Sequence, residues 1–464
     1  MSTDYDSIRQ RNIKEYGEGT KHLSYFSDIY STRTHFIFEV LQNAEDALSR
    51  RPANSPAGYV HFYLFPDRLE IRHNGIPFTE QNVVGICGIG EGTKAGDYTQ
   101  IGKFGIGFKS VYAYTFFPQI HSGDEHFEIR RFVEPHPIDR VAGEDTLIVL
   151  PFDHPDKKPA WAFREDVSAD DAVREIGDAI RKLGIRTLLF LRHIEEVKWK
   201  MPDEKSGHFI RSKPDAVNNG WRKVEVLDHD EHLEEWRIFS VRNVEVQNAS
   251  QPIQVEVEVA FLVDGNKVTK ATSTELVVFF PTEKKTELGF LVQAPFKTTK
   301  ARDNIKSDDT ANRQMIEAAA QLAADSLPTL RDLGLLDMGS YAALPLRTQD
   351  FPEGSLFCPI YEKIREAIRT LPLMLAHDGN FIKADEAKLA RGKELVELFS
   401  PEQLGALFGK EKLVWLDASI TESGATADLH AYLVGRKKSG GQRSGNWSRL
   451  LTGYRLMPTP LHPN

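Results

Sequence analysis

The chain has 464 residues, and at roughly 150 residues per domain this length suggests about three domains. Its 41% apolar and 27% charged residues are an ordinary composition for a folded protein with a substantial core. The 58 Lys and Arg against 67 Asp and Glu give a formal net charge of −9, which excludes a global positive field that would hold nucleic acid nonspecifically. A local basic groove stays compatible with these numbers.

Cysteine content and hydropathy bear on the cellular compartment. Cys87 and Cys358 are too few for a disulfide framework or a zinc site of their own, which fits a reducing compartment. The longest apolar runs are far shorter than the roughly 20 residues that span a bilayer, and the polar N-terminus has no apolar stretch of the signal-peptide type. We therefore expect a cytoplasmic protein that does not enter a membrane.

The first third of the chain alternates between helical and strand-like patterns. Residues 1–30 are polar with scattered aromatic side chains and are predicted to form an arm packed on the remainder. Apolar residues then recur at helical spacing from Thr34 to Ser49, and Pro52 ends the pattern. The further predicted elements are two strands at residues 59–65 and 69–73, a short helix from about Thr79, a glycine-rich stretch from Gly85 to Gly107, a helix from Phe108 and strands up to Phe152.

A segment rich in Pro, Asp and Lys, residues 153–171, is predicted to be a linker. Beyond it, residues 170–330 are predicted to form a second, middle α/β domain. Its predicted strands are residues 186–194, 224–230, 238–246, 253–263 and 274–280, between helices at 172–183 and 313–330. Residues 331–464 show amphipathic helical patterns and predict a smaller, mainly helical C-terminal region. The expected fold class is α+β.

The predicted helix at residues 34–49 carries three polar side chains on one face. At about 100° per residue, Glu39, Asn43 and Asp46 fall within roughly 60° of one another, and the apolar stripe faces the opposite way. This set suits a magnesium–nucleotide site, because an Asn carbonyl oxygen can bind the ion and a Glu can take a proton from an attacking water. In isolation, the pattern is more typical of a solvated helix face.

Glycines precede the helix predicted at Phe108. Gly102, Gly105 and Gly107 would let backbone amides approach an anion closely at a helix N-terminus, and Lys103 adds positive charge. The run is not a Walker loop, because no Gly-Lys-Ser/Thr follows at the required spacing, and its position does not suit a dinucleotide fingerprint.

Taken together, four segments resemble the GHKL ATPases, the superfamily of gyrase, the ninety-kilodalton heat-shock chaperones, histidine kinases and MutL. The segments are FEVLQNAEDA, IRHNGIPFTEQNV, ICGIGEGTK and IGKFGIGFKSVY, and they are most similar to the sacsin-type, heat-shock-chaperone-like branch. The resemblance is strong over residues 30–152 and fainter over 184–330. It implies a GHKL (Bergerat) α/β sandwich that binds ATP over residues 31–155, with a mobile lid at about residues 85–107.

The resemblance also implies roles for individual residues, with ATP and Mg²⁺ as cofactors. Glu39 would be the general base that aligns the attacking water, and Asn43 the magnesium ligand. The residues implied beside the base are Asp46, Ala47, His73, Asn74, Gly75 and Thr146. The residues implied at the phosphates are Lys94, Gly102, Lys103, Phe104, Gly105, Ile106, Gly107 and Phe108.

His73 departs from the family pattern. It stands two residues before Gly75, where the family has an aspartate that accepts a hydrogen bond from the exocyclic amine of adenine. A neutral imidazole also accepts such a bond, but only in one tautomer, and an imidazolium cannot. Adenine selectivity is therefore less secure than phosphate binding, and a solvent-facing histidine at the strand end is the alternative interpretation.

A basic loop lies near the end of the predicted middle domain. Lys297, Lys300 and Arg302 fall within six residues, and the loop resembles one that projects a cation onto the terminal phosphate in the chaperone, gyrase and MutL branches. Arg302 is the first choice for this role, with the two lysines as alternatives. A solvated basic turn would have the same composition.

The leading hypothesis is a magnesium-dependent ATPase whose lid closure couples the first domain to the second and does work on a protein client, as chaperones do. A nucleotide-dependent homodimer fits the same scheme. One alternative is a DNA-processing or defence-associated ATPase, against which the acidic net charge argues mildly while the basic stretch from Arg436 keeps nucleic acid open as a partner. The other is a nucleotide-binding scaffold that does not hydrolyse, which His73 suggests and the presence of Glu39 and Asn43 disfavours.

Overall fold

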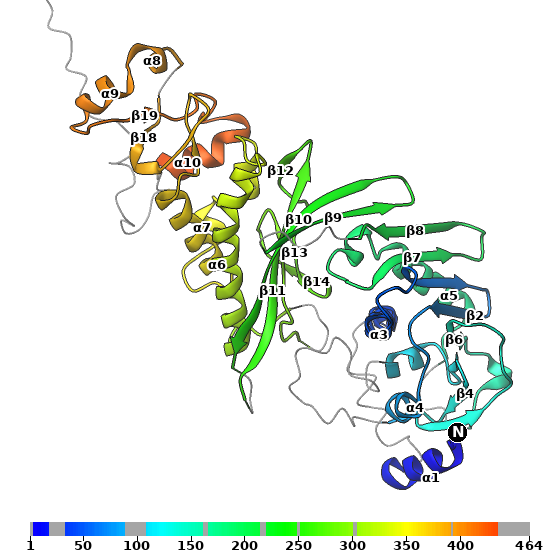
Figure 1. Ribbon diagram of the computed structural model, residues 1–464. Helices are drawn as coiled ribbons and strands as arrows, with labels where there is room; N and C mark the ends of the chain where they lie inside the picture. The colour runs from blue at the N-terminus through cyan, green and yellow to red at the C-terminus, as the bar shows by residue number, and fades with distance from the viewer. Residues whose placement is uncertain are drawn as a thin grey trace, which may run out of the picture.

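The computed structural model describes residues 3–17, 33–88, 108–160, 166–213, 220–247, 251–299, 304–390 and 393–434. Within these ranges the chain forms one large mixed sheet of 15 strands with helices packed on it, which confirms the expected α+β class (Figure 1). None of the helices in the described ranges combines the length and the apolarity needed to span a bilayer.

The first part of the chain contributes one edge of the sheet and the helices around it. Its helical segments are α1 (Tyr5–Tyr16), η2 (Arg33–His35), α3 (Phe36–Ser49), α4 (Glu80–Cys87), η3 (Phe108–Ala113) and η4 (Pro155–Lys157). Its strands are β1 (Gly58–Leu64), β2 (Arg68–His73), β3 (Gln119–Ser122), β4 (Glu125–Arg130), β5 (Glu134–Pro137) and β6 (Thr146–Pro151). The predicted arm contains the helix α1, which packs beside the edge strand β5.

The middle part continues the same sheet. Its elements are α5 (Ala169–Arg181), η5 (Ile185–Leu188), β7 (Ile194–Lys200), β8 (Ser206–Arg211), β9 (Trp221–Asp228), β10 (Leu233–Val246), β11 (Ile253–Asp264), β12 (Lys267–Thr269), β13 (Glu275–Val278), β14 (Phe280–Lys285), β15 (Leu291–Gln293) and α6 (Thr310–Asp332). The strand order is β14-β13-β15-β11-β10-β9-β8-β7-β1-β2-β6-β3-β4-β5, with β12 attached to β11. Strand β1 pairs in parallel with β7, so the sheet runs without interruption past the predicted linker.

Two local predictions were wrong. The run at residues 186–194 does not form a strand: it begins with the 3₁₀ helix η5, because Gly184 turns the chain with φ of 71° and the following leucines are buried. A continuous buried apolar run cannot by itself distinguish a strand from a helical segment. The run at 274–280 is split into β13 and β14 by Phe279, whose φ is 62°. The helix predicted from Phe108 is confirmed as the 3₁₀ helix η3.

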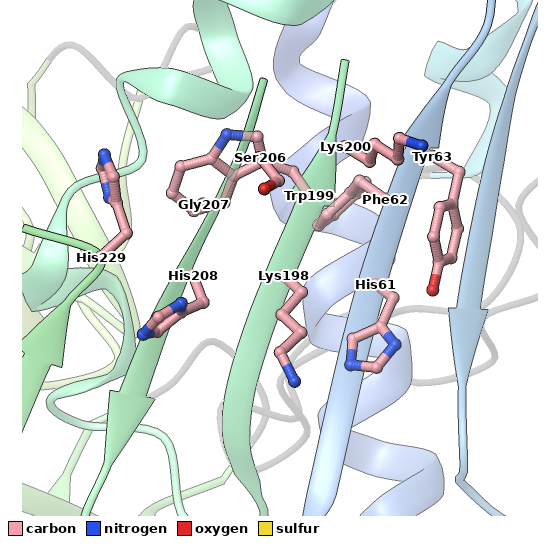
Figure 2. A pocket seen from close by; sticks show the side chains of 10 residues that line it. All are labelled: His61, Phe62, Tyr63, Lys198, Trp199, Lys200, Ser206, Gly207, His208 and His229. Carbon is pink, nitrogen blue, oxygen red and sulfur yellow. The ribbon is translucent and has the colours of Figure 1, made fainter. Parts of the chain in front are cut away.

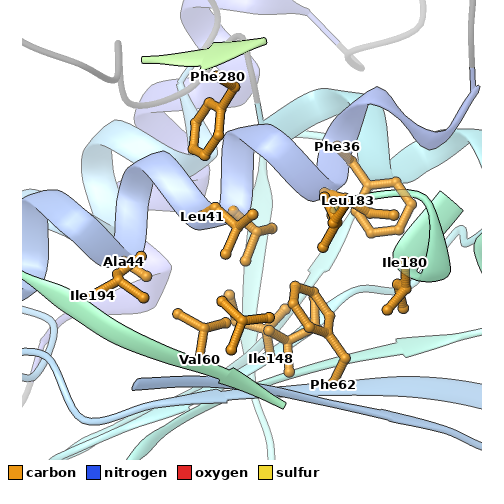
Figure 3. Close-up of a cluster of buried hydrophobic side chains, with 14 of the residues drawn as sticks. Phe36, Leu41, Ala44, Val60, Phe62, Ile148, Ile180, Leu183, Ile194 and Phe280 are labelled. Carbon is orange, nitrogen blue, oxygen red and sulfur yellow. The ribbon is translucent and has the colours of Figure 1, made fainter. Parts of the chain in front are cut away.

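Helices cover the two faces of the sheet at different places. Helix α3 lies on one face of the first part, where Phe36, Leu41 and Ala44 pack toward strand residues such as Val60 and Ile194 (Figure 3). Helix α6 covers the opposite face at β10 and β11. Because side chains alternate along a strand, the long neighbouring strands β10 and β11 contribute to both cores.

The C-terminal part extends from the α6 side of the sheet. Helix α7 (Cys358–Thr370) packs along α6 and shares its core. The remaining elements are η6 (Ser340–Ala343), η7 (Thr348–Asp350), β16 (Met374–Leu375), β17 (Phe381–Ile382), η8 (Ala384–Glu386), β18 (Ala387–Lys388), α8 (Lys393–Leu398), α9 (Pro401–Leu407), β19 (Val414–Trp415), η9 (Gly424–Thr426) and α10 (Ala427–Val434). Helices therefore dominate this part, with two small sheets of two strands each.

Candidate functional site

Helix α3 presents its polar residues at the rim of its buried face. Glu39, Asn43 and Asp46 are half-buried, whereas the apolar stripe of the same helix is buried against the sheet. The Nδ1 atom of His35, just before the helix, lies 3.7 Å from Oε1 of Glu39. The three polar side chains thus share one side of α3, as the helical spacing predicts.

A hollow opens between α3, the end of β2, α4 and η3. Its lining residues are Val40, Asn43, Ala47, Arg50, His73, Ile76, Phe78, Asn82, Ile86, Phe108 and Ile148. Asn43, Ala47, His73 and Phe108, four of the residues implied at the nucleotide, are therefore brought together from three elements, α3, β2 and η3. Glu39 does not line the hollow, but it lies one helical turn before Asn43 on the same side of α3.

His73 is only 2% exposed, so the solvent-facing interpretation was wrong. It sits at the end of β2 directly opposite Thr146 of β6. Its Nδ1 atom accepts a hydrogen bond from the backbone N–H of Gly75 at 3.2 Å. Burial lowers the pKa of His73 to about 4, against a smaller opposing effect of Asp145, so the ring is neutral at physiological pH.

The turn after β2 is fixed to both neighbouring elements. The Asn74 amide accepts from the backbone N–H of Tyr59 at 3.0 Å and donates to the carbonyl of Ala57 at 2.8 Å. A Cβ added to Gly75 would lie 2.6 Å from Cβ of Ala47, which is closer than real contacts allow. A glycine is therefore needed here because the turn packs directly against α3.

Thr146 is buried behind the wall of the hollow. Its hydroxyl is hydrogen-bonded to the hydroxyl of Ser122, which also accepts from the backbone N–H of Phe78 at 2.9 Å. Phe78 lines the hollow. Thr146 therefore fixes the position of that wall through Ser122, a residue that no motif in the sequence singles out.

A buried lysine was also missed by sequence reasoning. Lys109 is 2% exposed, and its ammonium donates to the carbonyl of Ile86 at 2.8 Å and to that of Phe132. Burial lowers its pKa to about 8, while the nearby Cys87 has a smaller raising effect. Because Ile86 lies at the end of α4 and Lys109 at the start of η3, this contact joins the two described elements that border residues 89–107. A lysine inside an apolar run was the available signal.

Several implied residues lie outside the described part of the chain. These are Lys94, Gly102, Lys103, Phe104, Gly105, Ile106, Gly107, Lys300 and Arg302. Lys297 is described, and its Nζ atom lies 2.9 Å from Oδ2 of Asp309, the N-cap residue of α6.

The start of the loop that bears Lys297 lies close to α3. The side chain of Gln293, at the end of β15, accepts from the backbone N–H of Phe279 at 2.8 Å. The ring of the next residue, Phe280, lies 5.1 Å from the ring of Phe38, centroid to centroid. Two contacts therefore connect the base of the loop with α3 at the residue before Glu39.

Glu45 is a further residue that sequence reasoning missed. It is buried on α3, and its carboxylate accepts hydrogen bonds from the backbone amides of Arg192, His193 and Ile194 at 2.6 to 3.2 Å. These amides lead into β7. The signal in the sequence was a carboxylate placed on the apolar side of the helix.

A second hollow lies over β1, β7 and β8, on the face of the sheet that points away from α3 (Figure 2). His61, Lys198 and His208 form one row across the three strands. The carboxylate of Glu196 lies 2.8 Å from Nε2 of His61 and 3.0 Å from the ammonium of Lys198, so it already contacts two of these side chains. A polyanion on this surface would therefore meet the negative charge of Glu196 as well as the lysines.

The chain shows distant similarity to sacsin-type proteins. A family model described as "Sacsin domain" matches residues 71–136, a span that includes His73, Gly75 and Phe108. Protein NO VEIN of Arabidopsis thaliana is 25% identical over 377 residues, which cover 75% of this chain and 13% of that protein. Sacsin of Homo sapiens is 25% identical over 244 residues, which cover 42% of this chain and 5% of sacsin. The chain thus spans a small fraction of either relative.

Proposed function

We propose that the chain binds a purine nucleoside triphosphate as its magnesium complex in the hollow beside α3 and hydrolyses it with GHKL-type chemistry. The observation that supports this proposal is that Asn43 and His73, from α3 and β2, line one hollow whose other walls are mostly apolar. An apolar slot with a few polar groups is the usual form of a site for a flat heterocycle. ATP is the nucleotide that the resemblance implies.

The residues around the hollow fit the parts that such a reaction needs. Ile76, Phe78 and Phe108 would enclose the base, and the amide oxygen of Asn43 would take one position around Mg²⁺ while phosphates and water take the others. Glu39, one turn away, would align the attacking water and accept its proton. Among the described residues, no cluster of three or more His, Cys, Asp and Glu is placed to hold a metal, so the phosphates would be the ion's main ligands.

Hydrolysis at this position would affect the conformation of the middle part of the chain. Helix α3 contacts that part through Glu45, which binds the start of β7, and through Phe38, which packs on Phe280. We infer a nucleotide-driven change at α3 that is passed to the second half of the sheet, with Arg302, Lys300 or Lys297 meeting the terminal phosphate. Work on a protein client, as in a chaperone, is the role that fits this coupling and the sacsin-type similarity.

The test is nucleotide binding and single-turnover hydrolysis by the purified chain, with Mg²⁺ and with a chelator, and with and without DNA. The parent should bind in the presence of Mg²⁺ and hydrolyse without DNA, and Asn43→Ala should lose the difference between Mg²⁺ and chelator. Equal affinity with and without Mg²⁺ for the parent would contradict the site. Hydrolysis that requires DNA would replace the protein client by a nucleic-acid partner.

A further inference from the structure

We propose that His73 makes the hollow selective for 6-oxopurine nucleotides, of which inosine triphosphate is the simplest probe, over adenine nucleotides. This inference rests on the proposed function, since it concerns the base that the same site would read. It reverses the selectivity that the resemblance implies, and it follows from the hydrogen bonds around one imidazole.

The first step is the position of the ring proton. Nδ1 of His73 accepts the backbone N–H of Gly75, so its lone pair is already in use. The ring is neutral because it is buried, and a neutral imidazole carries one proton. That proton is therefore on Nε2, which makes this atom a hydrogen-bond donor.

The second step is the environment of Nε2. His73 lines the hollow, and among the described residues no protein group accepts a hydrogen bond from Nε2. The surrounding wall is apolar and is formed by Val40, Ile76, Phe78, Ile86, Phe108 and Ile148. A flat ring bound against His73 would meet this N–H donor, and a donor requires an acceptor on the ligand.

The third step compares the two kinds of purine. Adenine has an amine at C6, which is a donor, so two donors would face each other if this edge meets His73. Hypoxanthine and guanine have a carbonyl oxygen at C6, which accepts from Nε2. Sites that hydrogen-bond one such group discriminate strongly against the mismatched analogue, because a buried polar group is left unpaired.

The fourth step is that the imidazole cannot easily turn over. Rotation of the ring would let it accept from an amine, but it would leave the buried N–H of Gly75 without its acceptor. Gly75 cannot move to another partner, because it is packed against Ala47 and the next amide, that of Ile76, is bonded to the carbonyl of Ala47 at 3.2 Å. The turn therefore holds His73 in the donating tautomer.

The test compares inosine and adenosine triphosphates, which differ only at C6 and the adjoining N1 proton. The affinities of their non-hydrolysable β,γ-imido analogues are measured with Mg²⁺ on the purified full chain, for the parent and for His73→Asp. A carboxylate only accepts, so the variant should prefer the adenine nucleotide. His208→Asp, on the opposite face of the sheet, introduces the same charge as a control and should keep the parental ratio.

For the parent, we expect the inosine analogue to bind about tenfold or more tightly than the adenosine analogue, as for one mismatched buried hydrogen bond. Equal binding, or tighter binding of the adenosine analogue to the parent, would overturn the inference and leave the proposed function standing. Absence of binding of both analogues would overturn the proposed function itself. If circular dichroism shows that His73→Asp is unfolded, the parental ratio alone decides.

Discussion

The carboxylate of Glu45 accepts the backbone amide of Ile194 at 2.8 Å, which joins helix α3 to the first residue of β7. The same carboxylate accepts hydrogen bonds from the two preceding amides, so three consecutive N–H groups donate to one side chain. Arg211, on β8, holds the same segment from the other side by donating to the carbonyls of Arg192 and Ile194. The helix that carries the proposed catalytic residues is therefore anchored to the middle of the large sheet.

Replacing Glu45 by Ala should destabilise the protein strongly, because three backbone amides, of which that of Ile194 is buried, lose their acceptor. We expect a loss of about 3 kcal/mol in the free energy of unfolding, measured by urea denaturation. Glu45→Gln keeps an amide oxygen as acceptor and should lose less. Glu317→Ala, which removes an exposed glutamate from α6, is the matched control and should stay within about 0.5 kcal/mol of the parent. A loss for Glu45→Ala no larger than for the control would show that the segment holds itself in place.

Glu39→Gln should keep nucleotide affinity and lose most hydrolysis, since the carboxylate is placed to handle water and not phosphate. Loss of a general base typically lowers the rate by about 100-fold or more. Single-turnover hydrolysis and equilibrium binding, measured on the same preparation, separate the two effects. Glu317→Gln controls for the loss of one negative charge. Parental turnover in Glu39→Gln would remove this residue from the mechanism.

The buried His73 should make stability depend on pH between about 4 and 6.5. The unfolded chain, with an ordinary histidine pKa near 6.5, binds a proton in this window, whereas the folded chain with a pKa of about 4 does not. The free energy of unfolding should therefore fall as the pH is lowered from 7 to 4, by up to roughly 3 kcal/mol from this residue.

His121 and His136 also have pKa values lowered by burial, so the profile of the parent must be compared with a variant that keeps them. His73→Asn does so, because its side-chain oxygen can still accept from Gly75 and it does not titrate. The variant should show a flatter decline from pH 7 to pH 4. Parallel profiles would mean that His73 takes up its proton over the same pH range in the folded and the unfolded protein.

Gly75 and Ala47 should be coupled energetically. A Cβ on Gly75 would collide with that of Ala47, so Gly75→Ala should cost about 1–3 kcal/mol. Ala47→Gly alone should cost up to about 1 kcal/mol, as glycine does inside a helix. In the double variant the collision is relieved, so its cost should be smaller than the sum of the two, which urea denaturation of all four proteins measures. Strict additivity would place the steric conflict elsewhere.

The sequence was sufficient for features set by local periodicity. Helix α3 and the strands β1 and β2 follow from helical spacing and alternation, and the structure confirms them. The tautomer of His73 could not be predicted, because it depends on the turn bringing the amide of Gly75 within 3.2 Å of the ring. The structural role of Glu45 could not be predicted either, since its hydrogen-bond partners lie about 150 positions further along the chain. Only the fold brings such groups together.

The parallel pairing of β1 with β7 constrains the order in which a newly made chain can fold. Strand β1 can pair with β2, which follows a few residues later, but the other edge of β1 stays unpaired until residues 194–200 have left the ribosome. An open strand edge is a template for wrong pairing, and closing a long loop is slow. More than 100 further residues must therefore be translated between the formation of the β1–β2 hairpin and the pairing of β1 with β7. A nascent chain whose translation stops in that interval would expose an unpaired edge of β1.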